Sequence, residues 1–300
     1  MVNCGVYELG RVLGKGTYGC VYECVNDKGL KFAIKKLLFS IKYEAIFLFF
    51  REISILKNLN HPHIVDLRDI VLDDSSSVGN TSCVYLVMDL FDSDLRHYVK
   101  KNFVNRIVPI EILREWILKI CSAVEYLHIN EIMHRDLKPQ NILINAASGV
   151  LKIADFGLCK YVRGIGGGKC ALTHEIVTLW YRAPEIILGA PLYDKSIDMW
   201  SIGVMISEMC SGINPFNGRN EIDTLMKIFQ KIGTPTYLEV YTYINFSHKF
   251  PKWDESKSFA NWRDSTPTNT PLWITDILNK LLRNNPKERM TATQLLKHDF

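Results

Sequence analysis

The sequence predicts an α+β protein of two lobes, a small lobe rich in β-strand followed by a larger helical lobe. Three observations support this. The chain has 300 residues, enough for two compact units at about 150 residues per domain. Strand-like segments come first, and apolar stripes at helical spacing come later. Hydrophobic residues make up 47% and charged residues 23% of the chain, so it can bury a core.

The small lobe is expected over about residues 1–89 and begins with an antiparallel meander. Its strand-like segments lie at 7–13, 19–24 and 31–36, separated by glycines and by a turn at 26–29. A helix is expected to end near Leu59, before His61-Pro62. A polar loop over 73–82 and a strand over 83–88 follow, and a connector at about 89–92 leads into the second lobe.

The larger lobe, over about 93–300, is predicted from helical periodicity. One apolar stripe steps by three or four residues, after Pro109 provides a pre-set first turn; it consists of Leu113, Ile117, Ile120, Val124 and Leu127. A second stripe consists of Ile274, Ile277, Leu278, Leu281 and Leu282. Both stripes are interpreted as core, and the glycine-rich segment 164–168 as a flexible loop.

Charge and cysteine usage exclude several classes of protein. The net charge is +4, which is too small to indicate nucleic-acid binding. No apolar run approaches the roughly 18 residues of a membrane helix, and no secretory signal begins the sequence. The eight cysteines form no Cys-x-x-Cys pair and are interpreted as reduced thiols. We expect an intracellular protein, in the cytoplasm, the nucleus or both, with no direct nucleic-acid or membrane partner.

Residues 14–19 read Gly-Lys-Gly-Thr-Tyr-Gly, a pattern that lets a backbone approach phosphates closely. The glycines are expected between two strands, whereas a dinucleotide-binding Rossmann site needs a strand followed by a helix. A dehydrogenase is therefore disfavoured, and the chain has no Gly-Lys-Ser/Thr motif of the Walker type.

Lys35 stands in the apolar run Phe32-Ala33-Ile34-Lys35 and needs a partner, for which Glu52 is the natural candidate. Three blocks follow downstream: His134-Arg135-Asp136-Leu137-Lys138-Pro139-Gln140-Asn141, Asp155-Phe156-Gly157 and Ala183-Pro184-Glu185. Together with the glycine loop and the Lys35 strand, their order and spacing match the protein-kinase signature set. The chain thus resembles a protein kinase, which implies a bilobal kinase fold.

The resemblance also implies the chemistry. Phosphoryl transfer from ATP depends on positioning and charge neutralisation. Lys35, fixed by Glu52, would hold the α- and β-phosphates, and Asp136 would accept or orient the substrate hydroxyl proton. Lys138 would stabilise charge on the transferred group. Asn141 and Asp155 would supply oxygen ligands for Mg²⁺.

The nucleotide is expected between the lobes. Val21 and Ala33 would cover one face of adenine and Leu143 the other. Backbone groups of Asp89 and Phe91 would bond its edge, beside Met88 as gatekeeper. The phosphates would lie under the glycine loop, formed by Leu13, Gly14, Gly16 and Gly19.

Longer stretches resemble cyclin-dependent kinases over essentially the whole chain. They are residues 14–22, 51–57, 59–65, 173–189, 220–223, 233–235 and 250–253. A mitogen-activated kinase would show Thr-x-Tyr where this chain has Thr173-His174-Glu175. A kinase of that type without cyclin control, or a non-catalytic scaffold with a kinase fold, remains the alternative.

Regulatory and substrate positions follow from this resemblance. Thr17 and Tyr18 match inhibitory phosphorylation sites, and Thr173 matches the activating one. A phosphate on Thr173 would bridge a clamp formed by Arg51, Arg135 and Lys160. Lys160 replaces an arginine of the family and cannot offer a planar fork. Preference for protein substrates with Ser/Thr-Pro is implied, through a proline pocket at Ile176, Val177 and Arg182.

Two structural pairings are also expected, Glu185 with Arg289 and Asp198 with the loop that carries Asp136. The largest departure from the family is the run Ile46-Phe47-Leu48-Phe49-Phe50, whose apolar side chains surround the expected helix. A sheet buries only one side of a helix, so this run favours a docked cyclin or cyclin-like activating subunit; self-association or internal repacking is the alternative. The resemblance also admits a small regulatory subunit on the larger lobe.

Overall fold

The computed structural model describes the chain apart from residues 1, 17–18, 39–42, 74–82, 163–178, 191, 236–250, 255, 257–261 and 265. Most of the predicted polar loop and the glycine-rich segment 164–168 lie outside the described residues. The chain divides into two compact units. The first comprises Met1–Ser93 and Leu143–Cys159, and the second comprises Asp94–Ile142 and Lys160–Phe300.

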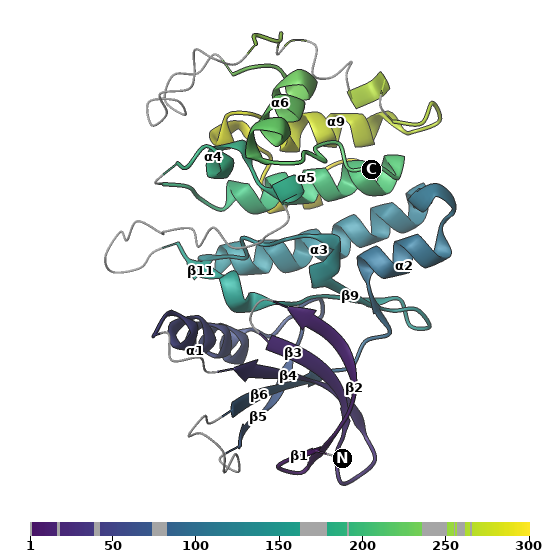
Figure 1. Ribbon diagram of the computed structural model, residues 1–300. Helices are drawn as coiled ribbons and strands as arrows, with labels where there is room; N and C mark the ends of the chain where they lie inside the picture. The colour runs from purple at the N-terminus through teal and green to yellow at the C-terminus, as the bar shows by residue number, and fades with distance from the viewer. Residues whose placement is uncertain are drawn as a thin grey trace. The chain divides into compact units, whose positions relative to one another are not determined.

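A six-stranded antiparallel sheet forms the first unit (Figure 1). Its strands, in the spatial order β1-β2-β3-β4-β6-β5, are β1 Val2–Cys4, β2 Tyr7–Gly16, β3 Gly19–Val25, β4 Lys31–Leu38, β5 Leu67–Asp73 and β6 Cys83–Asp89. The predicted meander and the strand near 83–88 are confirmed. The sequence did not predict β1 or β5, and Asp73 ends β5 where a loop residue was expected.

The two faces of this sheet bury different clusters. One face carries Cys24, Ile34, Tyr85 and Val87 in a common core with Tyr7. The other face carries Val84 and Leu86, against which Ile53 of α1 (Tyr43–Asn58) packs. Because side chains alternate along a strand, this second face also carries Lys35, which is paired in register with Leu86.

Three short elements complete the first unit. They are β9 (Ile142–Asn145), β10 (Val150–Ile153) and the 3₁₀ turn η3 (Phe156–Leu158). The Ile153 carbonyl accepts from the Val65 amide at 2.9 Å, and the Ile153 amide donates to the His63 carbonyl at 2.8 Å. These bonds tie residues after 143 to residues before 93. β7 (Ser93–Asp94) joins β9 and β10 in a three-stranded sheet.

The second unit is mainly helical (Figure 1). Its longer helices are α2 Leu95–Asn102, α3 Ile110–Ile129, α5 Ser196–Ser211, α6 Glu221–Ile232 and α9 Leu272–Leu281, with shorter α4 Pro184–Ile187 and α10 Ala292–Leu296. Short connecting elements are η1 Val104–Arg106, β8 Ile132–Met133, η2 Pro139–Asn141, β11 Lys160–Tyr161, η4 Leu179–Tyr181 and η6 Pro286–Glu288.

Both apolar stripes are buried as predicted, in α3 and α9, each of which contacts α5. Pro109 is the N-cap of α3: its ψ of 142° is extended, and its carbonyl accepts from the Leu113 amide at 2.9 Å in the first turn. Leu282 is the C-cap of α9, and its side chain is buried as predicted.

Two further findings concern membranes and thiols. Among the described helices, none is both long and apolar enough to cross a bilayer. The cysteines whose side chains are described are free thiols. Cys4, Cys24, Cys121, Cys159 and Cys210 are buried, and Cys20 is half-buried.

Candidate active site

Lys35 is the centre of the polar cluster in the first unit. Its Nζ donates to Glu52 Oε1 at 2.8 Å, to Glu52 Oε2 at 3.1 Å and to Asp155 Oδ1 at 3.1 Å. The side chains of Lys35 and Glu52 are only 12% and 5% exposed. Burial by itself would lower the pKa of Lys35, but the charges of Glu52 and Asp155 outweigh it and raise that pKa above its ordinary value. The structure therefore brings together the pair that the sequence predicts and adds Asp155 to it.

Three elements position this cluster. β4 presents Lys35 on the sheet face that α1 covers, and α1 supplies Glu52 one residue before the packed Ile53. Asp155 follows β10 with a left-handed φ of 64°, which costs a non-glycine residue of the order of 1–3 kcal/mol. A Cβ at Gly157 would lie 3.5 Å from Glu52 Oε2, so the backbone of η3 runs close to the ion pair.

The glycine motif of residues 14–19 lies at the end of the hairpin formed by β2 and β3. Gly14 and Gly16 lie in β2, where Gly14 pairs with Val21 and Gly16 pairs with Gly19. A loop was expected over this motif, but β2 extends to Gly16 and β3 begins at Gly19. Thr17 and Tyr18, the predicted inhibitory phosphorylation sites, lie outside the described residues. Leu13 precedes Gly14 and is 40% exposed.

The strand register places the predicted adenine-binding residues of the sheet on one face. Val21 pairs with Lys35, and Ala33 pairs with Met88, so these side chains share a face. The other predicted positions are in the same unit. Asp89 ends β6, with its carboxylate bound by Arg68 at 2.6 and 2.9 Å, and Phe91 and Leu143 are half-buried.

A second polar cluster, in the second unit, surrounds Asp136. Its Oδ2 accepts from Lys138 Nζ at 2.7 Å and from Asn141 Nδ2 at 2.9 Å. Asn141 Nδ2 also donates to the Asp136 carbonyl at 2.8 Å. Within the described part of the chain, Oδ1 of Asp136 accepts no hydrogen bond. One carboxylate oxygen is therefore fixed, while the other remains available to a ligand.

Asp198, near the start of α5, binds the backbone of the two residues that precede Asp136. Its carboxylate accepts from the backbone amides of His134 and Arg135 at 2.9 and 2.8 Å and contacts His128 Nε2 at 2.9 Å. Burial favours the neutral acid, yet the bonds and charge of His128 and the Arg135 amide lower the pKa of Asp198 below its ordinary value. The predicted bracing by Asp198 is confirmed. The sequence did not reveal His128, which is 70 residues away.

The proposed phosphate clamp is described only in part. Arg51 is half-buried in α1, and Lys160 lies in β11. Arg135 has a left-handed φ of 71° and donates from Nη1 to the hydroxyl of Tyr193 at 2.9 Å. Thr173 lies outside the described residues, so this structure gives no geometry for the phosphorylated state.

Of the three residues predicted to form the proline pocket, the structure describes Arg182. Ile176 and Val177 lie outside the described residues. Arg182 has a side chain that is 15% exposed, 4.0 Å from Glu221. Burial lowers the pKa of Arg182 from its ordinary value. The guanidinium is therefore held in an environment from which water is largely excluded.

Asn141, in the second unit, and Asp155, in the first, each offer oxygen donors that suit Mg²⁺. Both amide hydrogens of Asn141 are used on Asp136, so Oδ1 of Asn141 is left as an oxygen donor. Asp155 contributes a carboxylate that is 42% exposed. Hard oxygen donors such as these suit Mg²⁺. No group of three or more His, Cys, Asp or Glu in the described ranges is arranged to hold a metal ion.

Glu52 fixes Lys35, and Lys138 and Asn141 fix Asp136. A fixed ammonium group and a fixed carboxylate are what an enzyme needs to position a phosphorylated nucleotide and an acceptor group. A family model described as the protein kinase domain matches residues 7–300. The chain therefore belongs to the protein kinase family, and its β-rich first unit and helical second unit are those of the protein kinase fold. It is a phosphotransferase that binds ATP and acts on proteins.

Proposed function

We infer that this protein kinase is a proline-directed serine/threonine kinase of the cyclin-dependent type, activated by a cyclin-like subunit. The observation that carries the catalytic part is the carboxylate of Asp136, with Oδ2 held by Lys138 and Asn141 and Oδ1 open. The finer assignment rests on the resemblance of the quoted stretches to cyclin-dependent kinases.

Lys35 provides the positive charge for the α- and β-phosphates of ATP. Glu52 and Asp155 keep its ammonium group protonated and aimed. Val21, Ala33 and Met88 offer an apolar face for adenine, with Leu143 on the other side of the base. Asn141 and Asp155 would hold Mg²⁺, which neutralises phosphate charge when bound.

Asp136 prepares the acceptor. Oδ1 receives the hydrogen of a serine or threonine hydroxyl, and the hydroxyl oxygen then forms its bond to the γ-phosphorus as the bond to ADP breaks. Lys138 is bonded to the other oxygen at 2.7 Å and therefore lies next to the negative charge that moves during transfer.

Selectivity and activation are assigned to further residues. Arg182, Ile176 and Val177 would accept the proline after the acceptor. Phosphorylation of Thr173, read by Arg51, Arg135 and Lys160, promotes activity, and phosphorylation of Thr17 or Tyr18 opposes it by adding negative charge near the ATP phosphates. The 62% exposure of Phe50 on α1 supports docking of the activating subunit on this helix.

The test uses the purified chain with and without its co-purifying subunit. We expect phosphorylation of Ser-Pro peptides in preference to matched Ser-Ala peptides. Asp136→Asn and Lys35→Arg should each lower kcat/KM by at least about 100-fold, since they remove the acceptor base and the fixed ammonium group. Asp27→Asn and Lys28→Arg, in the exposed turn before β4, serve as controls.

The alternatives give different results. A non-catalytic scaffold would show no thermal stabilisation by Mg-ATP, whereas a working site gains about 2.7 kcal/mol at 100 times Kd. Full activity of the lone chain would remove the subunit requirement and favour a kinase outside cyclin control. Equal rates on Ser-Pro and Ser-Ala peptides would reject proline direction.

A further inference from the structure

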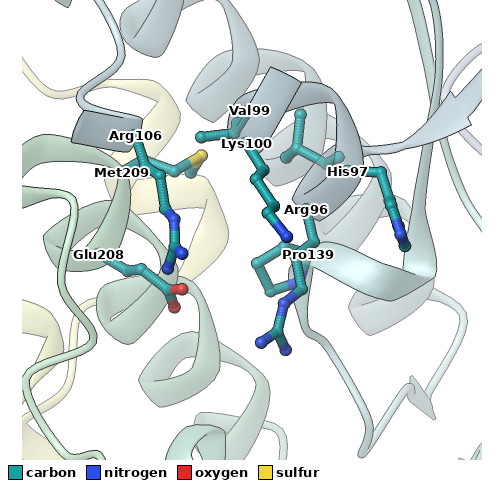
Figure 2. A pocket seen from close by; sticks show the side chains of 9 residues that line it. Arg96, His97, Val99, Lys100, Arg106, Pro139, Glu208 and Met209 are labelled. Atoms are coloured by element: carbon teal, nitrogen blue, oxygen red, sulfur yellow. The ribbon is translucent and has the colours of Figure 1, made fainter. Parts of the chain in front are cut away.

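A small basic pocket lies in the second unit, beside the loop that carries Asp136. It has a volume of about 140 Å³ and lies between α2, η1, η2 and α5. Its lining consists of Leu95, Arg96, His97, Val99, Lys100, Arg106, Pro139, Glu208 and Met209. Figure 2 shows the side chains of Arg96, Lys100 and Arg106 reaching toward the same space.

The positive charge of this pocket is only partly offset internally, because Arg96, Lys100 and Arg106 share the lining with a single carboxylate, Glu208. Among the described residues, the side chains of Arg96, Lys100 and Arg106 form no ion pair and no hydrogen bond. Glu208 is the one carboxylate of the lining, and its Oε2 already accepts from the Tyr181 hydroxyl at 2.5 Å and from Asn214 Nδ2 at 2.9 Å. Three cations around one small space repel one another, so an anion between them would be stabilised.

The fold fixes the backbone that carries Arg106 against α5. The Val108 amide donates to the Met209 carbonyl at 2.9 Å, which fixes the end of η1 on α5. At Gly212 a Cβ would come 2.1 Å from the Asn105 carbonyl oxygen, so glycine permits this close contact. Arg106 itself has a left-handed φ of 63°, a conformation that few arginines adopt.

The size of the pocket limits the ligand. Its volume of about 140 Å³ is that of a small pocket. A phosphate monoester fits such a space, whereas a nucleotide needs the roughly 300 Å³ or more of an ordinary ligand pocket. Two guanidinium groups favour a phosphate, because their planar forks bind its oxygens in pairs.

The location points to the substrate. Pro139 of the lining directly follows Lys138, and α2 packs against η2, which carries Asn141. Three residues of extended chain span at most about 11 Å, so the Pro139 wall lies no further than that from the Asp136 backbone. A peptide whose hydroxyl reaches Asp136 would bring a side chain two to four positions away to this pocket.

We propose that Arg96, Lys100 and Arg106 form a subsite for a phosphorylated side chain of the protein substrate, a few residues from the acceptor. This rests on the proposed function, since it takes Asp136 as the acceptor site. The enzyme would then act best on proteins that another kinase has already phosphorylated nearby.

The test measures peptide binding in the absence of turnover. Fluorescent Ser-Pro peptides carry one phosphothreonine, placed in turn at each of the four residues before the acceptor and at the second, third and fourth residues after it, with threonine peptides as the reference. Anisotropy with the full chain, without ATP, should show at least about tenfold tighter binding at one or two neighbouring positions, or about 1.4 kcal/mol. Glutamate at the same position should give a smaller gain, and added salt should reduce both gains.

The variants are Arg96→Gln, Lys100→Gln and Arg106→Gln, singly and together. All three side chains are exposed, so the fold should be retained, as circular dichroism can check. The combined variant should bring the ratio of phosphorylated to unphosphorylated peptide affinity to about one. Lys101→Gln, an exposed lysine of α2 outside the pocket lining, should leave that ratio unchanged.

Two outcomes would overturn the proposal. One is equal affinity of wild type for all peptides of the series. The other is a preference that survives in the combined variant. Displacement of the peptides by a short RNA, with no effect of phosphothreonine position, would assign the cations to nucleic acid and also refute a substrate subsite. Because binding is measured without ATP, an inactive chain that still shows the preference would disprove the catalytic proposal alone.

Discussion

Asp198 shows how one buried carboxylate can fix a catalytic loop. It accepts from the amides of two consecutive residues, His134 and Arg135, and Arg135 has a left-handed φ of 71°. That backbone conformation is unfavourable for arginine, at about 1–3 kcal/mol, so the hydrogen bonds help to maintain it. The loop that follows presents Asp136.

Replacement of Asp198 by asparagine should reduce both stability and turnover. Asparagine has a single side-chain oxygen, whereas the two carboxylate oxygens of Asp198 accept from the amides of His134 and Arg135. The substitution also removes the negative charge that faces His128. A loss of about 3 kcal/mol or more is expected for such a buried network. Urea unfolding at pH 7 and kcat on a peptide substrate measure the two effects.

The pH dependence gives a second readout of the same variant. Because the folded-state pKa of Asp198 lies below its ordinary value of 3.8, its contribution to stability is fully present above about pH 4 and is lost as the pH falls through the folded pKa. The difference in stability between wild type and Asp198→Asn should therefore be constant above about pH 4 and narrow below it. A gap that widens on acidification would contradict this assignment.

Individual site residues and some of their partners, such as Glu52 for Lys35, could be predicted from motif order and family resemblance, but other partners could not. The spacing of Lys35, Asp136 and Asp155 in the chain identified the chemistry. The contact of Asp198 with His128 joins residues 70 positions apart, and the bond from Tyr181 to Glu208 joins residues 27 apart. Such partners depend on helix packing, which no local pattern encodes.

At the scale of elements, strands with clear alternation were predictable and β5 was not. Leu67-Arg68-Asp69-Ile70 places two charged residues in succession, which weakens the period-two pattern. In the fold Arg68 binds Asp89, and Asp69 accepts from the Tyr7 hydroxyl at 3.1 Å. Tertiary partners therefore offset the poor local pattern of this strand.

The helix α1 carries the prediction about activation. Phe50 is 62% exposed, so Phe50→Ser should leave the lone chain folded, as circular dichroism can check. It should weaken association with the activating subunit by about tenfold or more, since a large aromatic contact is lost. Titration calorimetry with the co-purified subunit measures the affinity.

Leu72→Ser is the matched control, because Leu72 is 68% exposed on β5 of the same unit. Its affinity for the subunit should equal that of wild type. Unchanged binding by the Phe50 variant, or equal weakening by both variants, would show that α1 is not the docking element.

At the scale of the whole chain, one ion pair joins residues 104 positions apart. Arg289 binds both oxygens of Glu185, at 2.6 and 2.7 Å, and its Nε donates to the Arg283 carbonyl at 2.9 Å. The two side chains are 0% and 4% exposed. The sequence predicted this pair from its resemblance to the family, and the structure confirms it.

Arg289→Lys should destabilise the protein by about 2 kcal/mol or more, because lysine keeps the charge but loses the planar fork and the Nε bond. Differential scanning calorimetry should show a lower Tm than for wild type. Arg219→Lys, at an exposed position, should leave Tm within about 1 °C. A Tm equal to wild type in the Arg289 variant would mean that bidentate geometry adds nothing here.

The division of the chain has a practical consequence for anyone who trims it. The backbone passes from one unit to the other after Ser93, after Ile142 and after Cys159. A fragment that starts at Asp94 would keep Ile153 but lose its bonding partners, the His63 carbonyl and the Val65 amide. We expect such a truncated fragment to aggregate or to be digested by proteases, because these backbone groups of Ile153 would be left unpaired.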